Sequence, residues 1–296
     1  MRALTVCISA VLVLISAPVL ATTAIVDDWQ RTVFLPKAPQ RIVSLSAHLT
    51  ELIFEAGLGD KLIAVDLHSD FPLQVKQLPR LNVLPEPNLE ALLKLKPDLV
   101  LLWGQGLKRA TVERLENFGL RVWVSDPSRI EQIPQTLERL AGLAKPNAIA
   151  SDLASQQTSE RAKSLREKIT QSKAPVTASL VPVFMQVWQQ PLMTVGRNTM
   201  ISDALRHCAA HAVLSNAIKG SGVVSPEAVL RAAPVAIVTS NEQEARSYWK
   251  GRLNEEQYRK LQYIVVEANA LQRPSARLID ALAPLCRKID ALRNQK

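Results

Sequence analysis

EALLKLKPDLVL (Glu90–Leu101) and EAVLRAAPVAIV (Glu227–Val238) are near copies of one pattern within a single chain. Each begins with Glu-Ala, continues with apolar residues, and places a proline about two helical turns after the glutamate, at Pro97 and Pro234. An amphipathic helix that is stopped by proline and followed by a buried apolar strand explains both copies. The chain therefore repeats one helix–strand unit, as two similar halves would.

The residues just before each copy are typical helix starts. Asn88 can cap the first helix, and Ser225 can cap the second, in which Pro226 takes the first helical position. Glu90 and Glu227 then fall in the first turn, where the helix dipole favours a carboxylate. Each unit is predicted to be a capped helix that leads into a buried strand.

Strand-like and helix-like segments alternate around both units. The predicted strands are RIVSL (41–45), LIAV (62–65), LVLLW (99–103), RVWVS (121–125), VTASLVPVFMQVW (176–188, one or more strands), AIVTS (236–240) and YIVVE (263–267). The further predicted helices are HLTELIFEAG (48–57) and NTMISDALRHC (198–208). This alternation predicts an α/β fold with two lobes and mostly parallel sheets.

The segment 147–173 between the halves contains no glycine and lies between Pro146 and Pro175. It is predicted to form one uninterrupted helix of about 40 Å, which is stiffer than a Gly/Ser-rich linker. The predicted organisation is an N-terminal lobe (25–145), a backbone helix (146–174) and a C-terminal lobe (175–296). A ligand cleft of nearly fixed width would lie between the lobes. The alternative is a surface helix of one larger domain.

Residues 1–24 match a secretory signal peptide, with Arg2, a short apolar run and small residues that allow cleavage after Ala21 or Ala24. Cys7 lies too early for a lipid anchor at the cleavage point. A soluble exported protein is therefore expected. Export leaves Cys208 and Cys286, and an oxidising compartment favours a disulfide between them over two buried thiols.

Charge and motifs give little support to other function classes. The formal net charge is +9, but the basic residues are dispersed among acidic ones, which argues against nucleic-acid binding. Gly104, Gly106 and Asp126 form part of a dinucleotide fingerprint, but Arg109 stands where the third glycine belongs. A strand–helix turn at a cleft edge is the favoured interpretation. The sequence contains no nucleophile elbow, phosphate-binding loop or HExxH motif.

Histidines offer weak candidate sites. His207 and His211 have the spacing that places two imidazoles on one helix face, but two ligands do not complete a metal site, so no metal is predicted there. His48 and His68 each follow a predicted strand, where α/β folds bind ligands.

Trp103 and Trp188 are similarly placed after predicted strands, one in each half. Two indoles that face one cleft would suit a large flat ligand. The alternative for each residue is an ordinary place in the core.

Four segments and the cysteine pair resemble a known family: RIVSLSAHLTELIFEAG, LHSDFP, NLEALLKLKPDLVLLWG and QVWQQPLMTVG. They are similar to the periplasmic binding proteins of cobalamin and iron-siderophore ABC importers, from about Arg41 to the C-terminus. SDFP, QVWQQPLMTVG and the two cysteines are most similar to the cobalamin-binding members. The resemblance implies two Rossmann-like lobes joined by a long helix, a periplasmic location, no catalytic residue, no cofactor and a monomer when free.

The resemblance also implies roles for individual residues. Glu90 and Glu227 match the glutamates, one per lobe, that meet arginine pockets on the two transmembrane subunits of the importer. His68 aligns with a ligand-contacting tyrosine, Trp103 with a tryptophan, and Arg273 with an arginine. The imidazole of His68 would also be able to reach a cobalt or iron centre.

Several positions depart from the family pattern. Asn269 stands in place of an acid, and two aromatic residues are lost, at Leu84 and near Ser221. A third aromatic residue is displaced: the family position corresponds to Val187, and Trp188 follows one position later. Cys208-Ala209-Ala210 replaces the family's Cys-Gly-Gly. The sequence therefore predicts a receptor for cobalamin or a related corrinoid, and leaves an iron-siderophore or haem receptor as the alternative. Two alternative functions belong to other classes: an exported enzyme of the NAD-dependent or hydrolytic kind, and a purely structural envelope protein.

Overall fold

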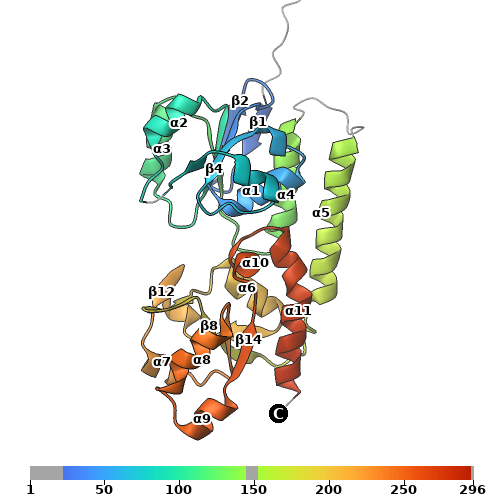
Figure 1. Cartoon of the computed structure of the whole chain (residues 1–296). Coiled ribbons are helices and arrows are strands. Elements are labelled where there is room, and N and C mark those ends of the chain that lie inside the picture. Colours follow the sequence, from blue (N-terminus) through green and yellow to red (C-terminus); the bar gives the residue numbers. More distant parts are fainter. Residues whose placement is uncertain (1–22, 84, 145–152, 295–296) are drawn as a thin grey trace, which may run out of the picture.

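The structure is a computed structural model that describes residues 23–83, 85–144 and 153–294. It consists of two α/β lobes placed end to end, with helices α5 and α11 along one side (Figure 1). Leu84, the predicted signal peptide up to Thr22, and residues 145–152, which include the start of the predicted backbone helix (146–174), lie outside the described residues.

The N-terminal lobe is built on a five-stranded sheet in the order β5-β4-β3-β6-β7, with every pair parallel. Its strands are β3 (Ile42–Ser44), β4 (Leu62–Asp66), β5 (Arg80–Leu81), β6 (Leu99–Trp103) and β7 (Val122–Ser125). Its helices are α1 (Ala47–Glu55), α2 (Leu89–Leu95), α3 (Arg109–Asn117) and α4 (Gln132–Ala141). An antiparallel hairpin of β1 (Thr23–Val26) and β2 (Thr32–Leu35) precedes this sheet. Cleavage after Ala21 would leave β1 whole, whereas cleavage after Ala24 would remove half of it.

The C-terminal lobe contains a parallel sheet in the order β11-β8-β13-β14 and a small antiparallel sheet in the order β12-β10-β9. The strands are β8 (Val181–Gln186), β9 (Trp188–Gln189), β10 (Leu192–Val195), β11 (Ala210–Ala212), β12 (Ser221–Val223), β13 (Ala236–Thr239) and β14 (Gln262–Val265). The helices are α6 (Met200–His207), α7 (Pro226–Arg231), α8 (Glu242–Lys250), α9 (Glu255–Lys260), α10 (Ala268–Gln272) and α11 (Ala276–Arg293). Both main sheets are parallel, which confirms the predicted fold class.

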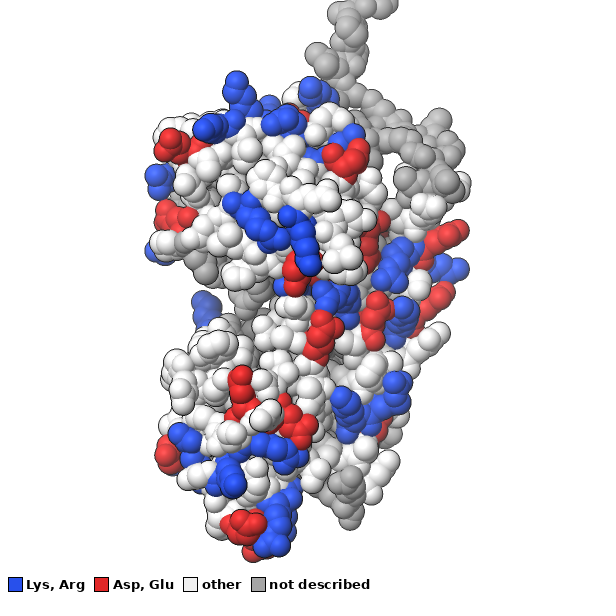
Figure 2. All heavy atoms as spheres, viewed as in Figure 1, with Lys and Arg blue, Asp and Glu red and all other residues white. Residues whose placement is uncertain are grey.

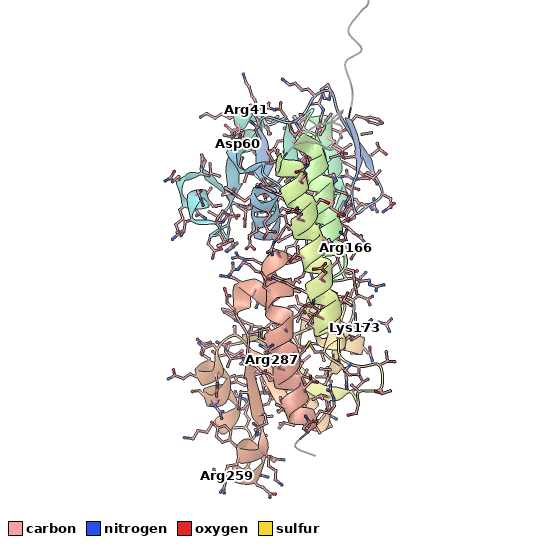
Figure 3. The ribbon with its side chains drawn as sticks, turned by 90° about the vertical axis from the view of Figure 1, so that its right-hand side faces the viewer. Arg41, Asp60, Arg166, Lys173, Arg259 and Arg287 are labelled. Carbon is pink, nitrogen blue, oxygen red and sulfur yellow. A yellow bond between two sulfur atoms is a disulfide. The ribbon has the colours of Figure 1, made fainter. Side chains whose placement is uncertain are left out.

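Helix α5 (Leu153–Ser172) lies beside the first lobe, reaches the start of the second, and is about 30 Å long (Figure 1). It packs against α4 of the first lobe and α11 of the second, and Figure 3 shows Arg166 along it and Lys173 just beyond its end. Arg166 pairs with Glu138 of α4, and Lys168 pairs with Asp280 of α11. The long helix predicted between the halves is therefore present from Leu153 onward.

One apolar core continues through both lobes. The same buried cluster includes Leu52 and Leu137 of the first lobe, Leu165 of α5, and Leu282 and Leu205 of the second. Burial of one such leucine contributes about 1.5–3 kcal/mol. Separation of the lobes would expose several of these side chains, so the core holds the lobes in a fixed relation.

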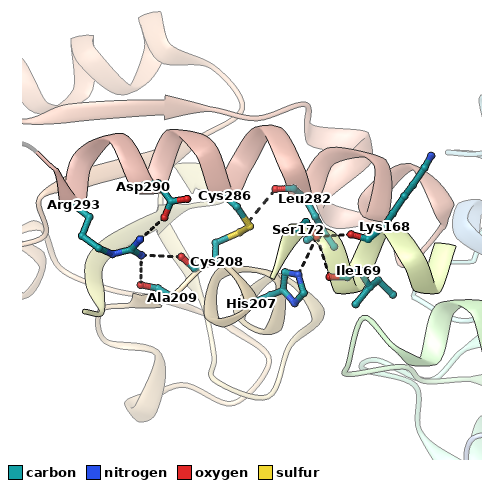
Figure 4. Close-up of a disulfide and its surroundings, with 10 residues drawn as sticks. All are labelled: Lys168, Ile169, Ser172, His207, Cys208, Ala209, Leu282, Cys286, Asp290 and Arg293. Carbon is teal, nitrogen blue, oxygen red and sulfur yellow. Dashed lines mark hydrogen bonds and ion pairs between the residues drawn. A yellow bond between two sulfur atoms is a disulfide. The ribbon is translucent and has the colours of Figure 1, made fainter. Parts of the chain in front are cut away.

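The predicted disulfide is confirmed. Cys208 at the end of α6 is bonded to Cys286 on α11, inside the second lobe (Figure 4). Arg293 further along α11 donates to the carbonyl oxygens of Cys208 and Ala209. The bond therefore fixes α11, which touches both α5 and the sheet, to the end of α6.

Candidate ligand-binding cleft and docking helices

The carboxyl ends of the strands in the first lobe face the second lobe. After β4, Asp70 accepts a bond from Asn269 Nδ2 (3.1 Å), and after β7, the Ile130 N–H donates to Asp203 of α6 (2.9 Å). Asn269 itself follows β14 of the second lobe. Because these contacts lie at either side of the sheet, the strand ends of β3 and β6 lie between them. Figure 2 shows the surface hollowed between the lobes on the side away from α5.

His48 and Trp103 form the middle of this edge. His48 follows β3 and Trp103 ends β6, and their ring centroids lie 5.3 Å apart in a T-shaped arrangement. His48 is 1% exposed, and its Nδ1 lies 2.6 Å from Ser46 Oγ. Burial, together with the charge of Arg273, lowers the pKa of His48 to about 3. A neutral imidazole therefore supports the more exposed indole of Trp103.

Two further predicted ligand residues are open to solvent. His68 is exposed after β4, and its backbone N–H donates to Asp66 Oδ2 (3.1 Å). Trp188 begins β9, directly beyond the end of β8, and is 56% exposed, while its Nε1–H donates to the Gln190 carbonyl (3.0 Å). Both rings thus keep a free face, one on each lobe.

Arg273 ties the two lobes together. Its Nη1 donates to Glu51 Oε1 (3.0 Å) and to Asp70, and its Nη2 donates to the His68 carbonyl (3.0 Å). Within the described part of the chain, its Nε–H and one Nη2–H make no bond, so donors remain for a ligand. Asn269 joins the same bridge through Asp70.

Glu51 is the buried centre of this bridge, with only 3% of its side chain exposed. It accepts from Ser275 Oγ (2.6 Å) and Arg277 Nη1 (3.4 Å) in addition to Arg273. Burial opposes ionisation of Asp70, but the hydrogen bond and charge of Arg273 outweigh it and hold the pKa of Asp70 below its usual value. The loop after β4 and the start of α11 are therefore joined by ionised groups.

The two repeated helices each present one exposed glutamate. Asn88 Oδ1 accepts the Ala91 N–H (3.0 Å) at α2, and Ser225 Oγ accepts the Ala228 N–H (3.2 Å) at α7, as predicted. Glu90 and Glu227 lie in the first turns and are exposed, and neither is ion-paired within the described ranges. Figure 1 shows α2 and α7 on the side of the molecule opposite α5, one in each lobe.

Comparison with known proteins identifies the family to which the chain belongs. Residues 42–260 match the family described as periplasmic binding protein. The chain belongs to this family. Vitamin B12-binding proteins of Photorhabdus laumondii and Pectobacterium atrosepticum are 33% and 31% identical over 86% of this chain, covering 89% and 90% of their own lengths.

Solved structures agree with this membership. The periplasmic vitamin B12-binding protein of Vibrio cholerae superposes with a TM-score of 0.75 and 27% identity, covering 87% of this chain and 99% of its own. A periplasmic haem-binding protein of Roseiflexus sp. RS-1 superposes with a TM-score of 0.67 at 20% identity, covering 86% and 99%, which shows the shared fold alone. No helix among the residues described in this periplasmic binding protein is long and apolar enough to cross a membrane.

One expectation about the histidines is wrong. Helix α6 ends at His207, because the backbone of Ala209 turns left-handed (φ 53°), and His211 lies on strand β11. The imidazoles therefore do not share a helix face. Burial lowers the pKa of His207, whose Nε2 lies 3.0 Å from Ser172 Oγ on α5.

The partial dinucleotide fingerprint has a packing explanation. A Cβ at Gly104 would lie 2.6 Å from Asp126 Cβ, so the glycine allows the ends of β6 and β7 to approach each other. Gly106 adopts φ 78° in the turn before α3. The segment is a strand–helix turn at the edge of the cleft, which is the interpretation that the sequence favoured.

Hollows also occur outside the cleft, in the second lobe. One of about 460 Å³ is bordered by Arg197, Arg206 and His211, and one of about 430 Å³ is bordered mostly by apolar residues between α7 and β14 and by Leu292 of α11. Neither includes a predicted ligand residue. The geometry of the strand ends locates the candidate site better than these hollows do, because α/β folds bind ligands beside the carboxyl ends of strands.

Sequence reasoning missed three residues of the strand-end edge: Trp29, Glu51 and Asp70. A signal for Glu51 existed, because a carboxylate stands there among Leu49, Leu52 and Ile53 of α1. Trp29 lies in the β1–β2 turn, and no periodicity relates it to β7, where its indole Nε1–H reaches Asp126 Oδ2 (3.3 Å).

Proposed function

We propose that this periplasmic binding protein captures cobalamin or a related corrinoid and delivers it to an ABC importer. The observation that carries the proposal is the pair of indoles at the facing strand ends, Trp103 on the first lobe and Trp188 on the second. Two aromatic faces on opposite walls of a cleft suit a broad, flat macrocycle. The relatives named as vitamin B12-binding proteins support this ligand class.

The other ligand contacts follow from the same edge. In this proposal Trp103, Trp188 and His68 pack on the corrinoid, and the remaining donors of Arg273 bind its polar periphery with Asn269 beside them. His48 takes part by holding Trp103.

A haem or iron-siderophore is the second candidate, because the exposed imidazole of His68 is able to coordinate an iron centre. Calorimetry separates the candidates. The chain from Thr22 to Lys296 is titrated with cyanocobalamin, haem and a ferric hydroxamate.

Submicromolar, one-to-one binding of cyanocobalamin alone is expected. Trp103→Ala and Trp188→Ala should each weaken it, whereas Phe118→Ala, an exposed aromatic at the far end of α3, should not. Binding of haem or the siderophore with no binding of cyanocobalamin would transfer the assignment to the second candidate. An absorption spectrum of the complex that is unchanged by His68→Ala would rule out a metal ligand at that position.

Delivery is proposed to use Glu90 and Glu227. Two similar lobes offer two similar carboxylates, and neither is committed to an ion pair in the described part of the chain. Such an arrangement fits a partner that presents a basic pocket on each of two transmembrane subunits. In this proposal the receptor is a monomer when free, reaches the periplasm through a cleaved signal peptide, and has its lobes at 25–145 and 175–296.

Charge reversal tests the docking role. Glu90→Arg and Glu227→Arg should each weaken complex formation with the importer and together abolish it, while the affinity for cyanocobalamin is unchanged. Glu160→Arg, on the exposed side of α5, is the matched control and should have no effect. Undiminished complex formation by the double variant would remove the docking role and leave the ligand assignment intact.

A further inference from the structure

The turn of the N-terminal hairpin reaches the same edge of the first lobe as Trp103. The Asp28 N–H donates to the Val124 carbonyl (3.0 Å), and the indole of Trp29 donates to Asp126 at the end of β7 (3.3 Å). Asp126 in turn packs against Gly104, the residue after Trp103. Trp29 is therefore the neighbour of the Trp103 platform along the row of strand ends.

Trp29 is held rigidly in this place. Asp27 Oδ1 accepts the backbone N–H groups of Trp29 and Arg31 (2.9 Å each), which closes the turn, and Gln30 adopts a left-handed backbone (φ 62°) within it. Side-chain packing adds to this, because the ring lies against the core cluster that includes Val122 and Val124. A fixed aromatic ring at the cleft edge is a platform on which a mobile side chain can be ordered.

The side chain ordered on this platform is Arg109. Its guanidinium lies 4.9 Å from the centroid of the Trp29 ring, a cation–π distance. Arg31 is also near the ring, at 5.7 Å, but it is bonded to Asp27, Glu116 and the Val122 carbonyl. Arg109 is exposed and makes no hydrogen bond or ion pair within the described ranges. Its donors are therefore available to a ligand.

We propose that Arg109, oriented by Trp29, binds the anionic phosphodiester of the corrinoid's nucleotide loop while the ring system lies on Trp103. This inference rests on the proposed function and names a specificity-determining contact within it. A guanidinium stacked on an indole keeps its edge free, and that edge matches a phosphate with two parallel hydrogen bonds. The arginine that breaks the dinucleotide fingerprint thereby acquires a role.

The test compares two corrinoids that share the ring but differ in the nucleotide loop that carries the anion. Cyanocobalamin carries the nucleotide loop with its phosphodiester, and dicyanocobinamide lacks it. Arg109→Gln should weaken binding of cyanocobalamin roughly 10-fold, the loss expected for charge-assisted hydrogen bonds, and change binding of dicyanocobinamide by less than about twofold. Trp29→Leu should weaken cyanocobalamin in the same selective way. Arg114→Gln is the control, because that exposed arginine of the same helix already pairs with Glu86.

The outcomes separate the inference from the function on which it rests. Equal losses for both corrinoids, or no loss for either, would overturn the contact at Arg109 and leave corrinoid binding established. A wild-type protein that binds neither corrinoid would end the proposed function and this contact with it. Raised salt offers a second readout: the advantage of cyanocobalamin over dicyanocobinamide should shrink in the wild type and be unaffected in Arg109→Gln.

Discussion

Replacement of Glu51 by glutamine should lower the stability of the whole chain, because one buried carboxylate joins the lobes. Glu51 accepts from Arg273, Ser275 and Arg277, and its side chain is 3% exposed. Glutamine keeps the volume and one acceptor oxygen but removes the charge. Asp70 still pairs with Arg273 and Glu267 still pairs with Arg277, so neither guanidinium is stranded.

The magnitude follows from the two charge-assisted bonds. A hydrogen bond between charged groups contributes about 1.5–3 kcal/mol, and one with a neutral partner contributes about 0.5–1.5 kcal/mol. The difference, summed over the bonds to Arg273 and Arg277, lowers the free energy of unfolding by about 2 kcal/mol. For a chain of this size that loss corresponds to a fall in Tm of roughly 4–8 °C.

Thermal and urea unfolding measure this loss, and Glu55→Gln is the matched control. Glu55 lies one turn further along α1 and pairs with Arg161 at 3.4 Å, but it is partly exposed, so its loss should cost about 0–1 kcal/mol. If Glu51→Gln were as stable as the control, the bonds of Glu51 to the second lobe would contribute nothing to stability, and the reasoning from burial would fail.

Two other predictions concern stability. Because the pKa of His48 is about 3 in the folded chain and near 6.5 unfolded, the unfolded state binds one more proton between these values. The free energy of unfolding should therefore fall by about 1.4 kcal/mol per pH unit as the pH decreases through this window. His48→Gln should remove this part of the pH dependence. Equal pH dependence of the unfolding free energy in the wild type and in His48→Gln would contradict the prediction. The Cys208–Cys286 bond closes a loop with a sequence separation of 78, and its reduction should lower the free energy of unfolding by up to about 4–5 kcal/mol through chain entropy. An unchanged denaturant midpoint after reduction would contradict this prediction.

Local signals in the sequence were sufficient for the regular elements. The strand LVLLW has the predicted bounds, and both repeated helices have the predicted caps at Asn88 and Ser225. These features depend on a few neighbouring residues, so a pattern within one segment decides them. The disulfide was predictable for a different reason, because removal of the predicted signal peptide would leave only two cysteines to pair.

The candidate site was predictable only to the level of strand ends. Position after a strand selected His68 and Trp103 as candidates, but it did not reveal that Arg273 is engaged by Glu51 and Asp70 from the other lobe. Nor did it reveal Trp29, which reaches the edge through a hairpin turn. Partners distant in the chain are set by tertiary packing, which leaves no periodic trace. The i, i+4 histidine pair failed for a local reason, since the helix ends between its members.

The contacts between the two lobes also affect how the protein distinguishes ligands. Opening the cleft as a hinge would break the Glu51 bridge and expose core residues such as Leu165 and Leu282, each worth about 1.5–3 kcal/mol. A ligand would have to supply that free energy as differential affinity for the open and closed forms. A cleft of fixed width is therefore the lower-cost arrangement, and selection between a corrinoid and haem then depends on the side chains at its walls. In the proposed function, ligand specificity is therefore expected to reside in wall contacts such as those of Trp188 and Arg109.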